Sequence, residues 1–187
     1  MERLQIGVMG SWRLNLPGSS YQIAEEVGEE IAQRGHVLVT GGTTGIGEYA
    51  RKGCMKFKGV NISIIPQLKS NYKYIGKYTD LIISSGFTEE GRIAIMINSC
   101  DAIIVIGGSS GTLIETLVGY LLGKSIVVIE ETGLTTENIK KIIDAEHYLD
   151  DKKLVKINFA KTAKDAVSMA IENIGKGRSS SDIPPMS

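Results

Sequence analysis

The residues of this sequence best suited to binding an anion form one short segment. It consists of six consecutive residues, Gly107, Gly108, Ser109, Ser110, Gly111 and Thr112. The apolar run before it predicts a strand and the pattern after it predicts a helix, so free backbone N–H groups and the positive end of a helix dipole would meet there. Glycine also lets a phosphate approach the backbone closely. We therefore expect phosphate binding, although a tight strand-to-helix turn without a ligand would give the same pattern.

Two further glycine-rich turns follow apolar runs earlier in the chain. Gly10 and Ser11 end the first run, and the second run leads into a segment that contains Gly41, Gly42 and Gly45. In a parallel sheet the carboxyl ends of the strands lie at one edge, and ligands collect there near the point where the strand order reverses. The sequence therefore predicts that three loops line one crevice.

Glu115 is the first of two charged candidates for chemistry in this crevice. We expect it in the first turn of the helix that follows the glycine-rich segment. Helical side chains lean toward the N-terminus, so its carboxylate would reach over the ligand loop. The segment 112–115 also fits a capping box, in which the carboxylate would only close the helix end. The spacing alone leaves both interpretations open.

Arg92 is the second charged candidate, at the start of a predicted helix. Its guanidinium could hold a phosphate or a base. Glu89 and Glu90 precede it closely in the sequence, however. Taken alone, this spacing favours an ion pair with the glutamates on the surface.

Apolar runs alternate with amphipathic segments along the chain. The predicted strands are residues 5–9, 36–39, 60–65, 81–83, 102–106, 126–129 and 155–157. The predicted helices are residues 21–34, 50–57, 92–98, 113–122, 136–145 and 163–174. This alternation indicates an α/β fold, a Rossmann-like doubly wound parallel sheet with helices on both faces. We expect a single Rossmann-like nucleotide-binding domain over 1–175, a loop over 67–79 at the ligand end or an edge, and a flexible tail over 176–187.

Composition narrows the classes of partner. Lysine and arginine together number 21, as do aspartate and glutamate, which leaves no broad basic face for a nucleic acid. Cys54 and Cys100 lack metal-ligand spacing and there are only two histidines, so we expect no metal site. The sequence shows neither a secretory leader nor an apolar stretch long enough to span a membrane. We therefore expect a cytoplasmic protein that binds a small molecule, without nucleic-acid or membrane partners.

One alternative is a short-chain dehydrogenase. Residues 40–47 match the TGxxxGxG nucleotide loop of that family, and Tyr120 and Lys124 match its YxxxK pair. In that family, however, the glycine loop follows the first strand, whereas here a complete strand–helix unit precedes it. We therefore expect Tyr120 and Lys124 to belong to a packed or subunit-facing helix.

Taken together, the motifs resemble those of the LOG-like (Lonely Guy) proteins, the cytokinin-activating phosphoribohydrolases, and of their relatives, the molybdenum cofactor carrier proteins. The resemblance covers about residues 3–175. It rests on Gly10-Ser11, Gly41-Gly42 with Gly45 and Gly47, Arg92, and Gly107-Gly108-x-x-Gly111-Thr112-x-x-Glu115. It implies that the last segment holds the phosphate of a nucleoside monophosphate or a pterin, and that Arg92 and Glu115 form a catalytic pair.

The resemblance leaves two functions open. A hydrolase would cleave the N-glycosidic bond of a nucleoside 5′-monophosphate to free base and ribose 5-phosphate, without metal or cofactor. A carrier would use the same loops only to hold molybdopterin or a similar phosphorylated pterin. The Arg92 and Glu115 pair favours the enzyme, whereas Ile106 and Ile93 stand where the hydrolases usually have proline and lysine. The family resemblance also implies a homodimer or a higher homo-oligomer, for which the apolar helix 113–122 is a candidate.

Overall fold

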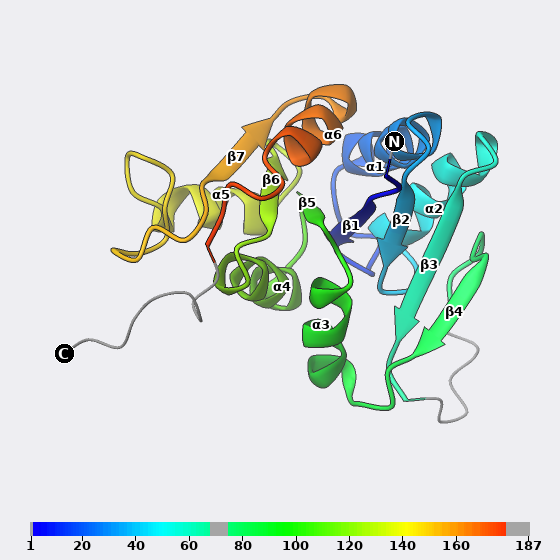
Figure 1. Cartoon of the computed structure of the whole chain (residues 1–187). Coiled ribbons are helices and arrows are strands. Elements are labelled where there is room, and N and C mark those ends of the chain that lie inside the picture. Colours follow the sequence, from blue (N-terminus) through cyan, green and yellow to red (C-terminus); the bar gives the residue numbers. More distant parts are fainter. Residues whose placement is uncertain (1, 68–74, 179–187) are drawn as a thin grey trace.

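The computed structural model describes residues 2–67 and 75–178 and shows one parallel sheet with helices on both faces (Figure 1). The strands are β1 (Gln5–Gly10), β2 (Val37–Thr40), β3 (Val60–Ile65), β4 (Leu81–Ser84), β5 (Ala102–Ile106), β6 (Ser125–Ile129) and β7 (Ile157–Ala160). Their order across the sheet is β4-β3-β2-β1-β5-β6-β7, and every neighbouring pair is parallel. The expected doubly wound fold is confirmed.

The six helices of the described residues divide between the two faces of the sheet (Figure 1). They are α1 (Gly18–Gln33), α2 (Ile46–Lys56), α3 (Glu89–Asn98), α4 (Ser110–Leu121), α5 (Leu134–Ile142) and α6 (Ala163–Glu172). Buried side chains of α1, α2 and α6 form one core with the sheet, and those of α3, α4 and α5 form the other. β5 and β6 are buried along their whole length, as expected for central strands rich in isoleucine and valine.

The last strand lies further along the chain than its sequence indicates. We expected a strand at 155–157, but β7 begins at Ile157. Leu154 and Val155 are buried all the same, because they pack into the core with α3 and α4 from a loop. Two consecutive apolar residues such as Leu154 and Val155 predict burial, but in this chain they are buried without being part of a strand.

Close packing of α1 against α2 fixes the positions of the loops that follow β1 and β2. Gly28 of α1 lies against the backbone of Ala50, and Gly53 of α2 lies against the backbone of Glu25, with no space for a Cβ at either glycine. Lys52 adds an ion pair to Glu25, with 2.9 Å between Nζ and Oε2. The two helices that follow the first two glycine-rich loops are thereby held as one unit.

The structure describes only part of the predicted tail and of the predicted 67–79 loop. Arg178 donates its backbone N–H to the carbonyl of Leu154, so residues 176–178 return to the body of the domain. The rest of the predicted tail lies outside the described residues, as does the centre of the predicted 67–79 loop. Among the helices of the described part, none has the length and apolar character needed to cross a membrane.

Candidate ligand-binding and active site

A cavity of about 950 Å³ opens at the carboxyl ends of the central strands. The structure places most of the sequence-predicted site residues around it. They are Gly10, Ser11, Gly41, Gly42, Arg92, Ser109, Ser110, Gly111, Thr112 and Glu115. Three loops from separate strands therefore meet in one place, as the sequence led us to expect.

Three of the predicted glycines lie behind the cavity wall instead of lining it. Gly45, Gly107 and Gly108 all have positive φ, of 71°, 55° and 105°. Gly45 lies directly against the carbonyl of Ser11, and the N–H of Ile46 donates to that carbonyl at 2.9 Å. The structure thus gives these glycines a role in shaping the loops, and their contact with a ligand stays a prediction.

The N-terminus of α4 faces the cavity. The helix begins at Ser110 with Ser109 as its N-cap, and the Ser109 side chain makes no capping hydrogen bond. The first N–H groups of a helix have no partner within the helix. Ser110, Gly111 and Thr112 therefore bring the start of the helix and the positive end of its dipole to the cavity, an arrangement that favours an anion.

This helix start also decides between the two interpretations of Glu115. A capping box needs Thr112 at the N-cap, but Thr112 is the third residue of α4, which starts earlier than the predicted 113–122. Glu115 consequently lies in the second turn, not the first as expected. Its carboxylate takes no part in capping and lines the cavity.

Glu115 is a buried carboxylic acid without a partner. Its exposed fraction is 8%, and no hydrogen bond or ion pair to it is found among the described residues. Burial raises its pKa to about 7, against which the positive charge of Arg92 acts in the lowering direction and Glu89 in the raising direction. A carboxyl group of this pKa can exchange a proton near neutral pH.

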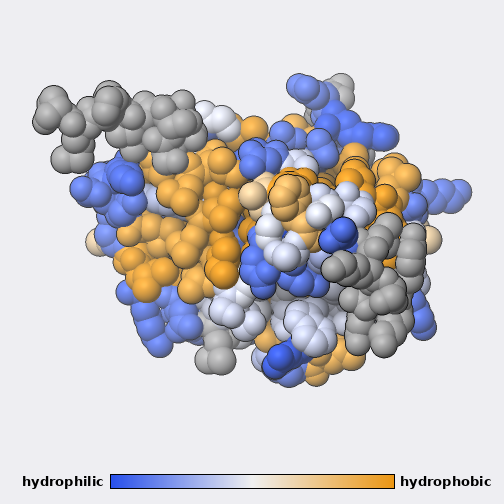
Figure 2. All heavy atoms as spheres, turned by 90° about the horizontal axis from the view of Figure 1, so that it is seen from below, coloured by the Kyte–Doolittle hydropathy of each residue, from blue (hydrophilic) through white to orange (hydrophobic). Residues whose placement is uncertain are grey.

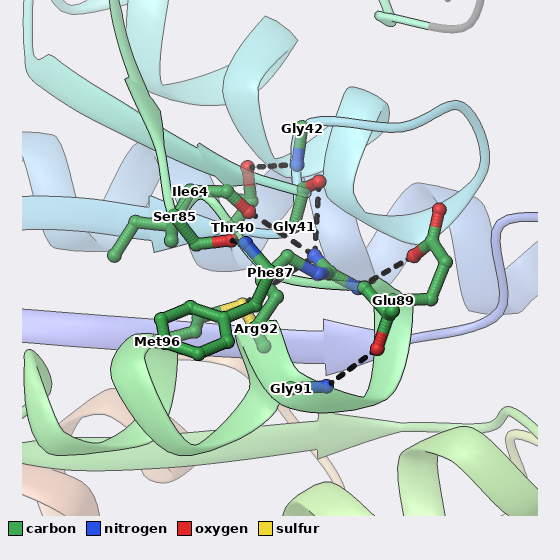
Figure 3. A network of polar contacts seen from close by, with 11 residues as sticks. Thr40, Gly41, Gly42, Ile64, Ser85, Phe87, Glu89, Gly91, Arg92 and Met96 are labelled. Carbon is green, nitrogen blue, oxygen red and sulfur yellow. Dashed lines mark hydrogen bonds and ion pairs between the residues drawn. The ribbon is translucent and has the colours of Figure 1, made fainter. Parts of the chain in front are cut away.

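Arg92 is buried as well, and it combines the expected ion pair to a neighbouring glutamate, Glu89, with hydrogen bonds to the backbone (Figure 3). Nη1 donates to the carbonyls of Gly41 at 3.0 Å and Ile64 at 3.2 Å, so the guanidinium holds the ends of β2 and β3. Nη2 lies 3.4 Å from the exposed carboxylate of Glu89, and Nε has no partner. No direct ion pair with Glu115 is found in the described part of the chain, so Arg92 acts on that carboxylate through its charge across the cavity.

Sequence reasoning missed Arg51, which organises the second glycine loop. It is fully buried on α2, and burial lowers its pKa to about 10. Its guanidinium donates to Thr40 Oγ1 at 2.8 Å and to the carbonyls of Thr43 at 2.8 Å and Lys77 at 3.2 Å. An arginine on the small-residue face of a predicted helix, beside Gly47, was the available signal. Trp12 and Arg13 were missed too, although they directly follow the Gly10-Ser11 turn and line the cavity.

The residues that suggested a dehydrogenase lie elsewhere. Tyr120 is buried, donates its hydroxyl to Asp150 Oδ1 at 2.8 Å and accepts the N–H of Leu154 at 3.3 Å. Lys124 contacts the carbonyl of Asn98 at 3.3 Å. Neither side chain lines the cavity. Tyr120 therefore has a structural role, as expected of a packed helix.

Comparison with known proteins agrees with the fold and the motifs. Residues 3–166 match the family model described as the SLOG cluster4 family. An uncharacterized protein of Archaeoglobus fulgidus is 33% identical over 130 residues, which is 70% of this chain and 82% of that protein. The crystal structure of TM1055 superposes with a TM-score of 0.80 at 28% identity, covering 93% of this chain and 100% of that one. The molybdenum cofactor carrier protein from Chlamydomonas reinhardtii gives a TM-score of 0.76 at 23% identity, covering 92% and 98%. The resemblance to LOG-like and carrier proteins is confirmed.

Replacing Gly111 with alanine should separate the needs of the fold from those of a ligand. A Cβ at Gly111 would meet nothing within 4 Å, and its φ is not positive. Alanine should therefore stabilise α4 by about 0.5–1 kcal/mol. Because Gly111 lines the cavity at the helix start, the added methyl group should weaken binding of a phosphate monoester at least tenfold.

Urea unfolding and calorimetric titration with ribose 5-phosphate measure the two effects of Gly111→Ala. Gly18→Ala, at the first residue of α1 and equally unobstructed, is the matched control and should gain stability without losing affinity. Unchanged ribose 5-phosphate affinity in Gly111→Ala would contradict anion binding at the start of α4.

Glu115→Gln should make the protein more stable above neutral pH. The folded-state pKa of Glu115 is about 7, above its ordinary value of 4.5, so the folded state binds the proton more tightly and the stability contributed by this group falls as pH rises from about 4.5 through 7. The loss at pH 8 is at most about 3 kcal/mol, and glutamine does not suffer it.

Thermal unfolding at pH 5 and pH 8 tests this linkage. The Tm of Glu115→Gln should exceed that of the wild type by several degrees at pH 8 and by much less at pH 5. Glu172→Gln, on the exposed surface of α6, should follow the wild type at both values. A difference that does not depend on pH would mean that Glu115 is not destabilised by ionisation.

Proposed function

We propose that this chain, which belongs to the SLOG cluster4 family, binds a nucleoside 5′-monophosphate and hydrolyses its N-glycosidic bond to free base and ribose 5-phosphate. The observation that carries the proposal is Glu115, a buried, unpartnered carboxylate with a pKa of about 7 that lines the same cavity as the α4 N-terminus. A buried carboxylate without an ion-pair partner reduces stability when it is ionised, so a chemical role is the best explanation for its presence.

The reaction divides between two ends of the ligand. The backbone N–H groups at the start of α4 would hold the phosphate and so fix the ribose in the cavity. The bond from C1′ to the base nitrogen breaks with its electron pair leaving on the base, and C1′ develops oxocarbenium-like positive charge. A water oxygen forms the new bond to C1′, giving ribose 5-phosphate, and the proton that the water gives up ends on the departing base.

Glu115 and Arg92 would act at the reacting carbon. Ionised Glu115 would stabilise the developing positive charge and take the proton of the attacking water. Arg92 has Nη1 committed to two backbone carbonyls and Nη2 paired with Glu89, so it would act on the ligand mainly through its positive charge. Its charge also keeps part of Glu115 ionised at neutral pH.

A carrier of a phosphorylated pterin is the second candidate function. It is supported by the similarity to the molybdenum cofactor carrier protein and by Ile93, an apolar residue that lines the cavity beside Arg92. The α4 N-terminus would hold the pterin's phosphate in the same way. In that case the bound molecule would leave unchanged.

We further propose a cytoplasmic homodimer formed through α4. This helix exposes Ile114, Leu117 and Leu121, with exposed fractions of 44%, 38% and 43%. Figure 2, seen from the side of α3 and α4, shows an extended hydrophobic area of surface. Apolar patches of this kind mark subunit contacts more often than free surface.

Release of base from nucleoside 5′-monophosphates tests the activity. Chromatography of a panel of monophosphates incubated with wild-type protein should show free base, and Glu115→Gln should slow it at least a hundredfold. Glu172→Gln should react at the wild-type rate. The rate should fall as pH drops below about 7, because Glu115 then becomes protonated. No release from any monophosphate, together with thermal stabilisation by a pterin or nucleotide that persists in Glu115→Gln, would identify a carrier instead.

Sedimentation tests the proposed dimer. Leu117→Glu would place a charge in the apolar contact and should convert the dimer to monomer. Phe57→Glu replaces a residue of similar exposure at the end of α2, outside this surface, and should leave the dimer intact. A wild-type monomer at tens of micromolar would rule out the contact.

A further inference from the structure

Trp12 is an exposed aromatic residue at the cavity, and the proposed mechanism has not used it. It is the one tryptophan of the sequence, it stands two residues after the end of β1, and 55% of it is exposed. Of the described residues that line the cavity, Trp12 alone is aromatic. A large, partly exposed aromatic ring at the wall of a cavity offers a contact surface to a ligand.

The backbone that carries Trp12 is held on both sides by hydrogen bonds. Thr44 donates its hydroxyl to the Trp12 carbonyl at 2.8 Å, and the Arg13 N–H donates to Ser11 Oγ at 3.0 Å. Tyr21 donates its hydroxyl to the Arg13 carbonyl at 3.2 Å. The backbone that carries the ring is therefore held in place, which lowers the entropy lost when a ligand binds against this loop.

Gly45 belongs to the same arrangement. It lies against the backbone of Ser11 and Trp12 so closely that a Cβ has no room. The second glycine loop thus supports the loop that carries Trp12. This contact accounts for a glycine that does not reach the cavity itself.

Arg13 further orients the ring. Its guanidinium carbon lies over the Trp12 ring at 5.2 Å from the centroid, in a cation–π contact. Arg13 contacts the indole on one face, and more than half of Trp12 remains exposed. It also adds a positive charge to the cavity, where an anionic ligand would bind.

The sheet places Trp12 and the anion site on adjoining loops. β1 and β5 are neighbours, with Gly10 paired to Ile106, so the loops that carry Trp12 and Ser109 leave the sheet side by side. A nucleotide carries its phosphate and its ring at opposite ends of the ribose. A phosphate bound at α4 therefore needs a second contact for the ring elsewhere in this cavity.

We propose that Trp12 is the stacking surface for the heteroaromatic ring of the ligand, so that the site selects phosphorylated compounds with a planar ring over ribose phosphate alone. This inference rests on the proposed function for the phosphate end. Stacking of a base on an aromatic side chain changes affinity by about tenfold or more. Trp12 contributes to binding equally before and during the reaction, so its loss raises KM more than it lowers kcat.

The single tryptophan supplies its own readout. AMP should quench the fluorescence of the wild-type protein, and ribose 5-phosphate should displace AMP without quenching. In calorimetric titrations, Trp12→Leu should weaken AMP binding about tenfold or more and leave ribose 5-phosphate binding within twofold. Trp12→Phe keeps a smaller ring and should retain most of the AMP affinity, while Phe57→Leu, an exposed aromatic outside the cavity, should change neither.

The outcomes separate this inference from the proposed function. If Trp12→Leu weakened the binding of AMP and of ribose 5-phosphate equally, Trp12 would only stabilise its loop, and the inference would be overturned. Unchanged AMP binding and an unchanged KM for base release would overturn it while hydrolysis stands. Quenching and selective weakening without any base release would support stacking and reject the hydrolase. Absence of AMP binding to the wild-type protein would overturn both.

Discussion

The pairing of β1 with β5 determines where this protein can bind a ligand. The chain runs outward from β1 through β2, β3 and β4, and then returns to add β5 on the other side. The helix after β1 consequently packs on one face of the sheet and the helix after β5 on the opposite face. Because the two connections diverge, a gap opens between them at the carboxyl edge, as expected at a topological switch point.

The features of the site follow from this gap. The Gly10-Ser11 turn and the start of α4 form its two sides, and the second glycine loop closes it from β2. Arg92 and Arg51 each hold that second loop by donating to its backbone carbonyls. Two buried cations in one small region would repel each other and favour an anion nearby, which fits a cavity that opens onto a helix N-terminus.

The sequence was sufficient for the parts of the structure that depend on local pattern. Alternation of apolar runs with amphipathic segments predicted the sheet, and glycine-rich turns after three runs predicted which loops meet. The errors arose where tertiary packing decides. α4 starts three residues earlier than its apolar period indicates, which moved Glu115 into the second turn and removed the capping interpretation. The last strand was predicted too early in the chain, because Val155 is buried although it lies in the loop before β7.

The functional residues divide in the same way. The motif and the family resemblance predicted Glu115 and Arg92 as site residues. The sequence could not show that the two interact through charge without a direct ion pair. The sequence pattern could mark Arg51 as unusual but not show its role, because its partners Thr40, Thr43 and Lys77 come together only in the fold. Gly41 shows the converse: the sequence marks it as a ligand contact, whereas the structure shows that it also makes room for the Arg92 guanidinium.

The environment of Glu115 bears on the choice between hydrolase and carrier. A phosphate bound at α4 adds negative charge to the cavity, so in the ground-state complex it would disfavour the ionised carboxylate further. When C1′ becomes positive as the glycosidic bond breaks, the same carboxylate is attracted to it. The interaction is therefore unfavourable with the bound nucleotide and favourable in the transition state, which is the difference that accelerates a reaction. In a carrier only the unfavourable interaction with the bound phosphate would occur, so a glutamine at position 115 would serve a carrier better. The presence of a glutamate, which the charge of Arg92 keeps partly ionised, is the physical argument for the proposed hydrolysis.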